Sequence, residues 1–292
     1  MTAHGPDSTA TYTPPTMAGN AEWSQDDFDS LYRDIGLYRT HREWLANQPA
    51  LASFPPRTLA AIADYRERLA KGLLLEWLDP PAGAQVLDNG CGVGYFLFDL
   101  LDAYPDRDLH CTGVDLSQAG LDLLEKRKEI EGCDRIESRR ADIGKLPFFE
   151  GAFDAVVCSE VLDHAPDPAG ILREMARVTK PGGKLLITVP NGRAMRMWDA
   201  LRAKARHLLG RPDSEEDYFE TYLAVADIRR WIAEAGLGIE REALNTALPV
   251  ASLARMAPRF MQSAAARFYL TIEPLLRSER LSMNYAVAAV KA

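Results

Sequence analysis

The segment VLDNGCGVGYF, which runs from Val86 to Phe96, decides the fold of this chain. With the two residues before it, its first half forms AQVLDNG (residues 84–90), which reads as a short buried strand running into a glycine-rich turn. Glycines at positions 90, 92 and 94 let a tight turn bring its backbone against a ligand at the N-terminus of the next helix. The pattern therefore indicates a nucleotide-like ligand.

The spacing of these glycines separates two classes of ligand. A dinucleotide site of the form G-x-G-x-x-G needs a glycine or alanine at position 95, where this chain has the bulky Tyr95. Asp115 ends the second strand about 20 residues later, where a carboxylate can accept both ribose hydroxyls of an adenosyl group. At this point an ordinary strand-turn-helix without a ligand remains an alternative.

Strands and helices alternate after the glycine turn, which predicts right-handed crossovers and a mainly parallel sheet covered on both faces. The expected strands are 109–115, 135–140, 153–159, 184–189, 238–244 and 284–290, and the expected helices are 93–101, 118–131, 169–178, 195–209 and 226–235. The fold class is therefore α/β, a Rossmann-like doubly wound sheet of about seven strands.

The rest of the chain surrounds this α/β unit. Residues 1–20 are polar and aperiodic and are expected to be a disordered tail, and residues 21–79 show helical periodicity typical of an N-terminal extension or cap. Residues 80–292 are expected to form the domain that binds the nucleotide-like ligand, with insertions at 192–222 and 249–282.

Composition restricts the partners. The chain has 292 residues and a formal net charge of -8, which argues against nucleic acid as a partner. No stretch approaches the roughly 20 apolar residues that span a bilayer, and the first 20 residues lack a hydrophobic signal core, so we expect a cytoplasmic protein.

The cysteines do not have the spacing of a metal site. Cys91, Cys111, Cys133 and Cys158 are scattered without a CxxC pair and lie in or beside apolar runs. This favours buried, reduced thiols over disulfides or zinc ligands, and we expect no metal site.

Four motifs in order resemble class I S-adenosylmethionine methyltransferases, especially the type found in ubiquinone and menaquinone biosynthesis. The resemblance runs from Val86 to Asn191 and is carried by VLDNGCGVGYF, GVDLS (113–117), ADIGKLPFFEGAFDAVVCSEVLDHAPDP (141–168) and LREMARVTKPGGKLLITVPN (172–191). It implies S-adenosylmethionine as cofactor and a seven-stranded sheet with one reversed edge strand. That strand would be 284–290, paired in hairpin fashion with 238–244.

The resemblance also implies a cofactor site. Asp88 would fix the glycine loop and approach the methionine ammonium, while Gly90, Gly92 and Gly94 form the turn. The other expected cofactor contacts are Asp115 on the ribose, Leu116 and Ile143 on the adenine faces, Asp142 on the adenine amino group, and Ser159 beside the methionine half. Core packing is the alternative for Leu116 and Ile143, and a cap or turn role is the alternative for the aspartates. Asn89 departs from the family, which often has a small or apolar residue there.

The catalytic candidates follow the fourth strand. If the acceptor is a hydroxyl or an acidic carbon, a base helps to remove its proton, and His164 is the best-placed candidate, with Glu160 and Asp163 nearby. The alternative is that His164 caps the following turn or orients a loop.

The expected reaction is in-line transfer of a methyl group to a small-molecule or lipid-like acceptor, with oxygen favoured modestly. Candidate pocket residues in the non-core pieces are Tyr32, Tyr38, Met195, Trp198, Tyr218, Tyr222, Met256, Phe260 and Met261. The basic segment 193–211 suits peripheral contact with an anionic membrane, although a solvated face is the more ordinary interpretation. The alternatives in function are a cofactor-binding partner or sensor without turnover and a nicotinamide-dependent oxidoreductase, which Tyr95 opposes.

Overall fold

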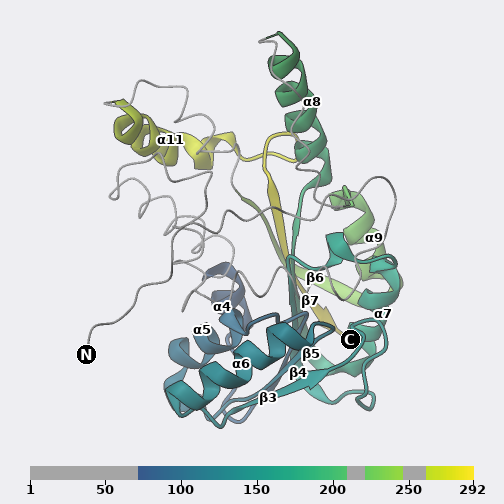
Figure 1. The fold of residues 1–292 in the computed structure, drawn as a ribbon. Helices are drawn as coiled ribbons and strands as arrows, with labels where there is room; N and C mark the ends of the chain where they lie inside the picture. Colours follow the sequence, from purple (N-terminus) through teal and green to yellow (C-terminus); the bar gives the residue numbers. More distant parts are fainter. Residues whose placement is uncertain (1–71, 209–220, 246–260) are drawn as a thin grey trace, which may run out of the picture.

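A computed structural model describes residues 72–208, 221–245 and 261–292, and these form a seven-stranded sheet with helices on both faces (Figure 1). The strands are β1 Gln85–Asn89, β2 His110–Asp115, β3 Ile136–Arg140, β4 Phe153–Ser159, β5 Thr179–Pro190, β6 Leu237–Asn245 and β7 Asn284–Lys291. Their order is β3-β2-β1-β4-β5-β7-β6. β7 is antiparallel to both of its neighbours and lies one position in from the edge strand β6. The expected fold class and the hairpin-like pairing of β6 with β7 are confirmed.

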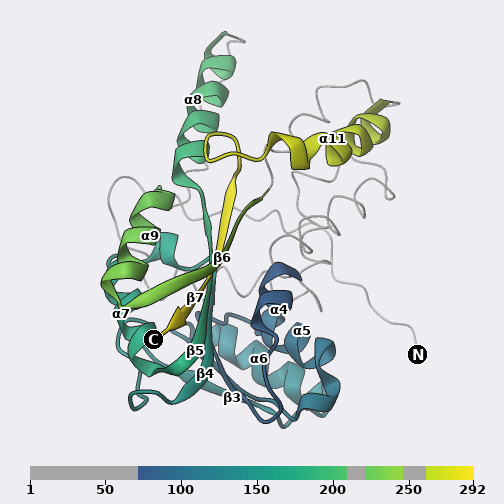
Figure 2. The ribbon, with the colours of Figure 1, turned by 180° about the vertical axis from the view of Figure 1, so that it is seen from behind.

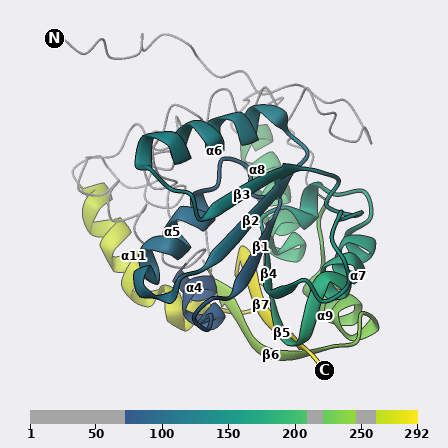
Figure 3. The same ribbon diagram turned by 90° about the horizontal axis from the view of Figure 1, so that it is seen from below.

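Five of the described helices form two layers, one on each face of the sheet, and two further helices extend beyond one end of it. α4 (Leu73–Leu78), α5 (Tyr95–Ala103) and α6 (Gln118–Glu131) cover one face, and α7 (Pro168–Val178) and α9 (Val225–Glu234) cover the other (Figure 3). α8 (Gly192–Leu208) and α11 (Gln262–Leu276) project beyond the end of the sheet where β5 ends and β7 begins (Figure 2). Two short 3-10 helices, Pro105–Arg107 (η3) and Leu162–His164 (η4), complete the described elements.

Two hydrophobic clusters hold the layers together, one on each face of the sheet. Successive residues of β1 point to opposite faces. Val86 packs in the cluster that contains Leu97 of α5, and Leu87 packs in the cluster that contains Leu172 of α7. All four side chains are fully buried. Burial on both faces explains why the strand is a continuous apolar run rather than an alternating one.

Two boundaries differ from the sequence-based expectation. α5 begins at Tyr95 rather than Val93, because Gly92 and Gly94 have φ values of 53° and 77° and belong to the turn. β5 begins at Thr179, five residues before the expected start at Lys184. The expected tail, most of the 21–79 extension, residues 209–220 of the first insertion and residues 249–260 of the second lie outside the described residues. So do the candidate pocket residues Tyr32, Tyr38, Tyr218, Met256 and Phe260.

The two insertions meet at Asn191. Its side-chain Nδ2 donates hydrogen bonds to the carbonyl oxygens of Glu279 (2.9 Å) and Ser282 (2.8 Å), in the turn that follows α11. Its Oδ1 accepts from the backbone N–H of Arg193 at 3.2 Å. This contact satisfies an N–H in the first turn of α8, so the helix begins at Gly192 rather than at the expected Met195.

All four cysteines are free; Cys91, Cys111 and Cys158 are buried and Cys133 is half-buried. In the three described ranges no three His, Cys, Asp or Glu side chains gather as a metal site would require. None of the helices in those ranges is both long and apolar enough to cross a bilayer.

Candidate active site

The glycine turn is a backbone structure that side chains would disrupt. Gly90 has a φ of 92°, a left-handed conformation that favours glycine, and its N–H donates to the carbonyl oxygen of Val114 at 2.8 Å. A Cβ added at Gly90 would lie 2.6 Å from Cγ2 of Val161. The turn therefore keeps bare backbone at the carboxyl end of β1.

Asp115 joins this turn to the next helix. Its carboxylate is only 6% exposed; Oδ2 accepts from the N–H of Gly92 at 2.8 Å and Oδ1 from the N–H of Ser117 at 2.9 Å. Ser117 in turn caps α6, because its Oγ accepts from the N–H of Gly120 at 3.1 Å.

The parallel register brings the ends of three strands together. Asp88 in β1 is paired with Gly113 of β2 on one side and Val157 of β4 on the other. Asp115 and Ser159 each lie two residues beyond these partners, at the same edge of the sheet. The strand order reverses direction at β1 and β4, and ligands of open α/β sheets bind outside the carboxyl ends of the strands at such a point.

Asp88 is a buried carboxylate at this edge, with 3% of its surface exposed. Burial raises the pKa of the Cys91 thiol, and the carboxylates of Asp115 and Asp88 raise it further. Burial likewise raises the pKa of Cys158, again with Asp88 adding to the shift. These thiols therefore stay protonated at neutral pH and do not act as nucleophiles.

The expected adenine contacts lie on the next two loops. Leu116 is 40% exposed, which removes the alternative that it is a buried core residue. Ile143 is half-buried and packs against the hydrophobic cluster that contains Leu172, so it does make the core contact that was its alternative role. Asp142 is exposed, and its Oδ1 accepts from the N–H of Gly144 at 2.8 Å, so it does make the turn contact that was its alternative role.

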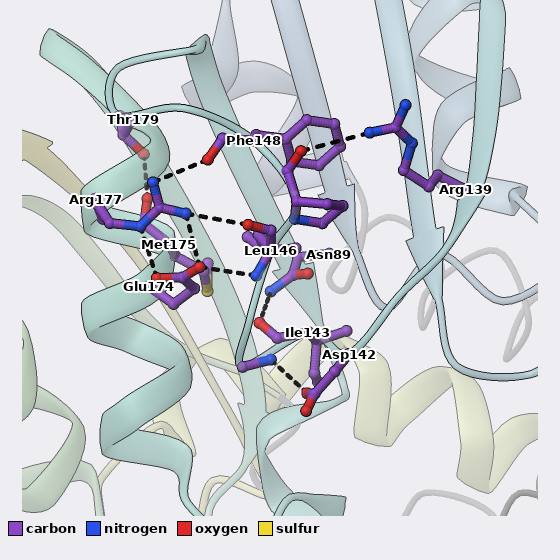
Figure 4. A network of polar contacts seen from close by, with 12 residues as sticks. Asn89, Arg139, Asp142, Ile143, Leu146, Phe148, Glu174, Met175, Arg177 and Thr179 are labelled. Atoms are coloured by element: carbon purple, nitrogen blue, oxygen red, sulfur yellow. Dashed lines mark hydrogen bonds and ion pairs between the residues drawn. The ribbon is translucent and has the colours of Figure 1, made fainter.

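Asn89, the departure from the family, is fully buried. Its Nδ2 donates to the carbonyl oxygen of Ile143 at 3.2 Å (Figure 4). The sequence indicates only that such an amide needs hydrogen-bond partners; the structure shows that it is tied to the loop that carries Ile143.

The end of β4 carries a strained residue. Glu160 has a φ of 56°, a left-handed conformation that is rare for a residue with a side chain. Its N–H donates to the carbonyl oxygen of Thr188 at 2.9 Å, and its Oε2 accepts from Nδ2 of Asn284 at 3.3 Å. Beside it, Oγ of Ser159 and Oγ1 of Thr188 share a hydrogen bond of 2.8 Å. Strain of this kind clusters at functional sites, and no sequence pattern announces it here.

Asp163 and His164 form an adjacent pair in η4. Nε2 of His164 lies 3.5 Å from Oδ2 of Asp163; the histidine side chain is 26% exposed and the aspartate side chain 2% exposed. Burial raises the pKa of Asp163, and His164 offsets part of that rise. The carbonyl oxygen of Asp163 accepts from the N–H of Thr221 at 2.7 Å, which attaches η4 to the segment before α9.

The raised pKa of Asp163 has a defined effect on stability. The folded state binds this proton more tightly than the unfolded state does. The stabilising contribution is therefore fully present below the unfolded pKa and is lost as the pH rises through the higher folded pKa. Above the folded pKa the buried carboxylate costs stability, which is typical of a group kept for function.

These groups fit an adenosyl sulfonium cofactor by their chemistry. The glycine turn presents backbone at Gly90, where a Cβ would collide with Val161; Asp115 offers a buried carboxylate of the kind that binds a diol, and Leu116, next in the chain, presents an exposed apolar side chain. Tyr95 occupies the first position of α5, where a dinucleotide fingerprint needs a small residue.

Comparison with known proteins agrees with this geometry. A family profile described as "Methyltransferase domain" matches residues 87–187. The chain is 30% identical over 172 residues to the ubiquinone biosynthesis O-methyltransferase of Pseudomonas aeruginosa, covering 58% of this chain and 72% of that protein. It is 32% identical over 194 residues to the protein of the same name from Thiobacillus denitrificans, covering 63% and 78% of the two chains.

A solved structure shares the fold. The geranyl diphosphate C-methyltransferase from Streptomyces coelicolor A3(2) matches with a TM-score of 0.60 at 18% identity, covering 93% of this chain and all of that one. The likeness extends beyond the strands to most of the chain. The relative that is 30% identical, with 72% of its length covered, establishes the family, and the sheet order and the glycine turn agree with it: the chain belongs to the class I S-adenosylmethionine-dependent methyltransferases.

Proposed function

We propose that this methyltransferase transfers the methyl group of S-adenosylmethionine to an oxygen atom of a small, lipid-like acceptor. The names of the relatives support oxygen, because both are called O-methyltransferases of ubiquinone biosynthesis. The observation that carries the proposal is the placement of His164, backed by the buried Asp163, just after the strand end that carries Ser159 and Glu160. A hydroxyl acceptor needs a base at that position.

We assign the cofactor contacts as follows. Asp115 holds the ribose hydroxyls, Leu116 and Ile143 lie on the two faces of the adenine, and Asp142 accepts from its amino group. The backbone of Gly90, Gly92 and Gly94 lies against the cofactor, and Asp88 and Ser159 border its methionine half. The exposure of Leu116 and the buried carboxylates of Asp88 and Asp115 support this assignment.

The cofactor supplies an electrophilic methyl group on a positively charged sulfur. The residues of the chain align the acceptor for an in-line attack, which is where most of the rate enhancement of such a displacement arises. His164 takes the proton of the acceptor hydroxyl. The carboxylate of Asp163, 3.5 Å from Nε2, then stabilises the imidazolium. Glu160, held by Asn284, borders the acceptor and orients it.

The alternative functions are less well supported. The relatives are methyltransferases by name, and the carboxylates expected at the cofactor side are present, so a binding protein without turnover is not favoured. Tyr95 at the start of α5 opposes a nicotinamide cofactor.

The four free cysteines suit a reducing compartment, which supports a cytoplasmic location.

Calorimetric titration of the purified protein with S-adenosylmethionine, S-adenosylhomocysteine and NADH tests the cofactor assignment. We expect micromolar binding of the first two ligands alone. That result would justify a screen of phenol, quinone and lipid acceptors for methylation at oxygen. Binding of NADH, or no binding of any of the three, would overturn the proposed function.

We further propose that α8 contacts an anionic membrane, where a lipid-like acceptor would be held. Arg193, Arg196 and Lys204 are exposed on this projecting helix, and Leu201 among them is 50% exposed. Cations next to exposed apolar side chains are typical of interfacial helices. Arg173 of α7 and Arg230 of α9 are exposed cations outside α8, so replacing one of them tests whether any change of surface charge alters membrane binding.

Vesicle flotation measures this contact. We expect the protein to float with phosphatidylglycerol-containing vesicles and not with phosphatidylcholine vesicles. The double variant Arg193→Glu/Lys204→Glu should lose at least about two-thirds of the bound fraction, since each cation near such a surface contributes about 1 kcal/mol. Arg173→Glu on α7 should bind like the wild type. Equal flotation of the wild type and the double variant would refute the contact.

A further inference from the structure

The segment 142–148, which carries the proposed adenine contacts, is held by side chains of α7, β1 and β3 (Figure 4). From β3, Nη1 of Arg139 donates to the carbonyl oxygen of Pro147 at 3.4 Å. From α7, Oε1 of Glu174 accepts from the N–H of Leu146 at 2.7 Å. Also from α7, the guanidinium of Arg177 donates to the carbonyl oxygens of Leu146 (3.2 Å) and Phe148 (2.9 Å). Glu174 and Arg177 pair with each other at 2.7 Å, so they act on the segment as one unit. Glu174 and Arg177 therefore fix residues 146–148 of the segment.

Asn89 fixes the other part. Its Nδ2 donates to the carbonyl oxygen of Ile143. Ile143 lies between Asp142, whose side chain accepts from the N–H of Gly144, and Leu146, which is bound by α7. The amide of Asn89 therefore ties the first strand to a turn that is also held by the N–H groups of Gly144 and Lys145 on Asp142.

This amide is unfavourable for stability. Asn89 is fully buried, and its Oδ1 has no hydrogen-bond donor within the part of the chain that the structure describes. It lies on the same face of β1 as Leu87, whose neighbours form the apolar cluster between the sheet and α7. A buried acceptor without a partner costs about 1–3 kcal/mol. A leucine at this position would remove the unpartnered acceptor and the hydrogen bond to the carbonyl oxygen of Ile143 together.

We propose that Asn89 is a positioning residue that holds the backbone of Ile143 in the geometry that binds the adenine of the cofactor. The proposal rests on the function proposed above, in which Asp142 and Ile143 contact the adenine. Asn89 acts through this loop and does not contact the reacting atoms. The protein retains it at a cost in stability because a loop that is held in advance loses less entropy when the cofactor binds.

Asn89→Leu separates a positioning role from a purely structural one. A structural residue should lower the melting temperature when it is replaced, whereas a positioning residue should weaken cofactor binding without lowering the melting temperature. We expect the melting temperature without ligand to rise or stay level. We expect the Kd for S-adenosylhomocysteine to rise about three- to tenfold, which corresponds to the loss of one hydrogen bond. Hydrogen exchange at the amide of Gly144 should become faster by a similar factor, and exchange at Leu146, whose N–H is held by Glu174, should not change. Val156→Ala, in the same cluster, should lower the melting temperature and leave the Kd unchanged.

The outcomes are distinct. If the wild type does not bind S-adenosylhomocysteine, the proposed function fails and this inference fails with it. If the wild type binds and Asn89→Leu binds equally well, the inference alone is overturned. A lower melting temperature for Asn89→Leu, with a Kd that weakens no more than in Val156→Ala, would also overturn it by making Asn89 a structural residue.

Discussion

Asp115→Ala is expected to raise the Kd for S-adenosylhomocysteine at least about 100-fold. The carboxylate would make two charge-assisted hydrogen bonds to the ribose, each contributing about 1.5–3 kcal/mol. It also accepts from the N–H groups of Gly92 and Ser117, so its removal loosens the glycine turn and the start of α6. Calorimetric titration of the variant measures the loss directly.

Two controls separate the ribose contact from the support of the turn. Asp115→Asn keeps the shape of the side chain and one acceptor oxygen, but its NH2 group faces the N–H of either Gly92 or Ser117. It should therefore loosen the turn less than Asp115→Ala does and lose at least about tenfold in affinity, because the negative charge that strengthens the ribose bonds is gone. Asp102→Ala, an exposed aspartate of α5, should change nothing. Unchanged affinity in Asp115→Ala, with a native circular dichroism spectrum, would remove Asp115 from the cofactor site.

His164→Ala is expected to lower kcat for a hydroxyl acceptor by a factor of about 10² to 10⁴, the range typical of a general base. The Kd for S-adenosylhomocysteine should change by less than about twofold, because His164 lies beyond the proposed cofactor contacts. Single-turnover methylation with a saturating cofactor measures the chemical step.

Asp163→Asn provides the matched variant for the base. It keeps the imidazole and removes the buried carboxylate beside it, so kcat should fall by a smaller factor, about tenfold, as the imidazolium loses its stabilising charge. A histidine that only orients the loop would show the opposite split, with both variants changing the KM for the acceptor at constant kcat.

Much of the fold could be predicted because its determinants are local. The glycine turn, the apolar run of β1 and the alternation that follows specify a parallel sheet, and most expected helices and strands begin within two residues of the observed ones. The register then follows from the buried pattern, so Asp88, Asp115 and Ser159 could be expected at one edge of the sheet before any coordinates were known.

The contacts between distant segments could not be predicted in this way. Nothing near Asn89 in the chain indicates that its amide meets Ile143, 54 residues away. The left-handed Glu160 and the burial of Asp163 likewise depend on how β5, β7 and the segment at Thr221 pack around the end of β4. Such features follow from tertiary packing, which the periodicity of a single segment does not encode.

The interior place of β7 sets the order in which the sheet can be assembled during synthesis. β6 hydrogen-bonds to β7, and β7 hydrogen-bonds to β5, so β6 reaches the sheet only through a strand that leaves the ribosome about 40 residues after it. Until then β5 presents an open edge of backbone N–H and C=O groups, to which another unfinished chain can attach. The nascent protein is therefore most exposed to misassociation after its cofactor-binding half has already been made.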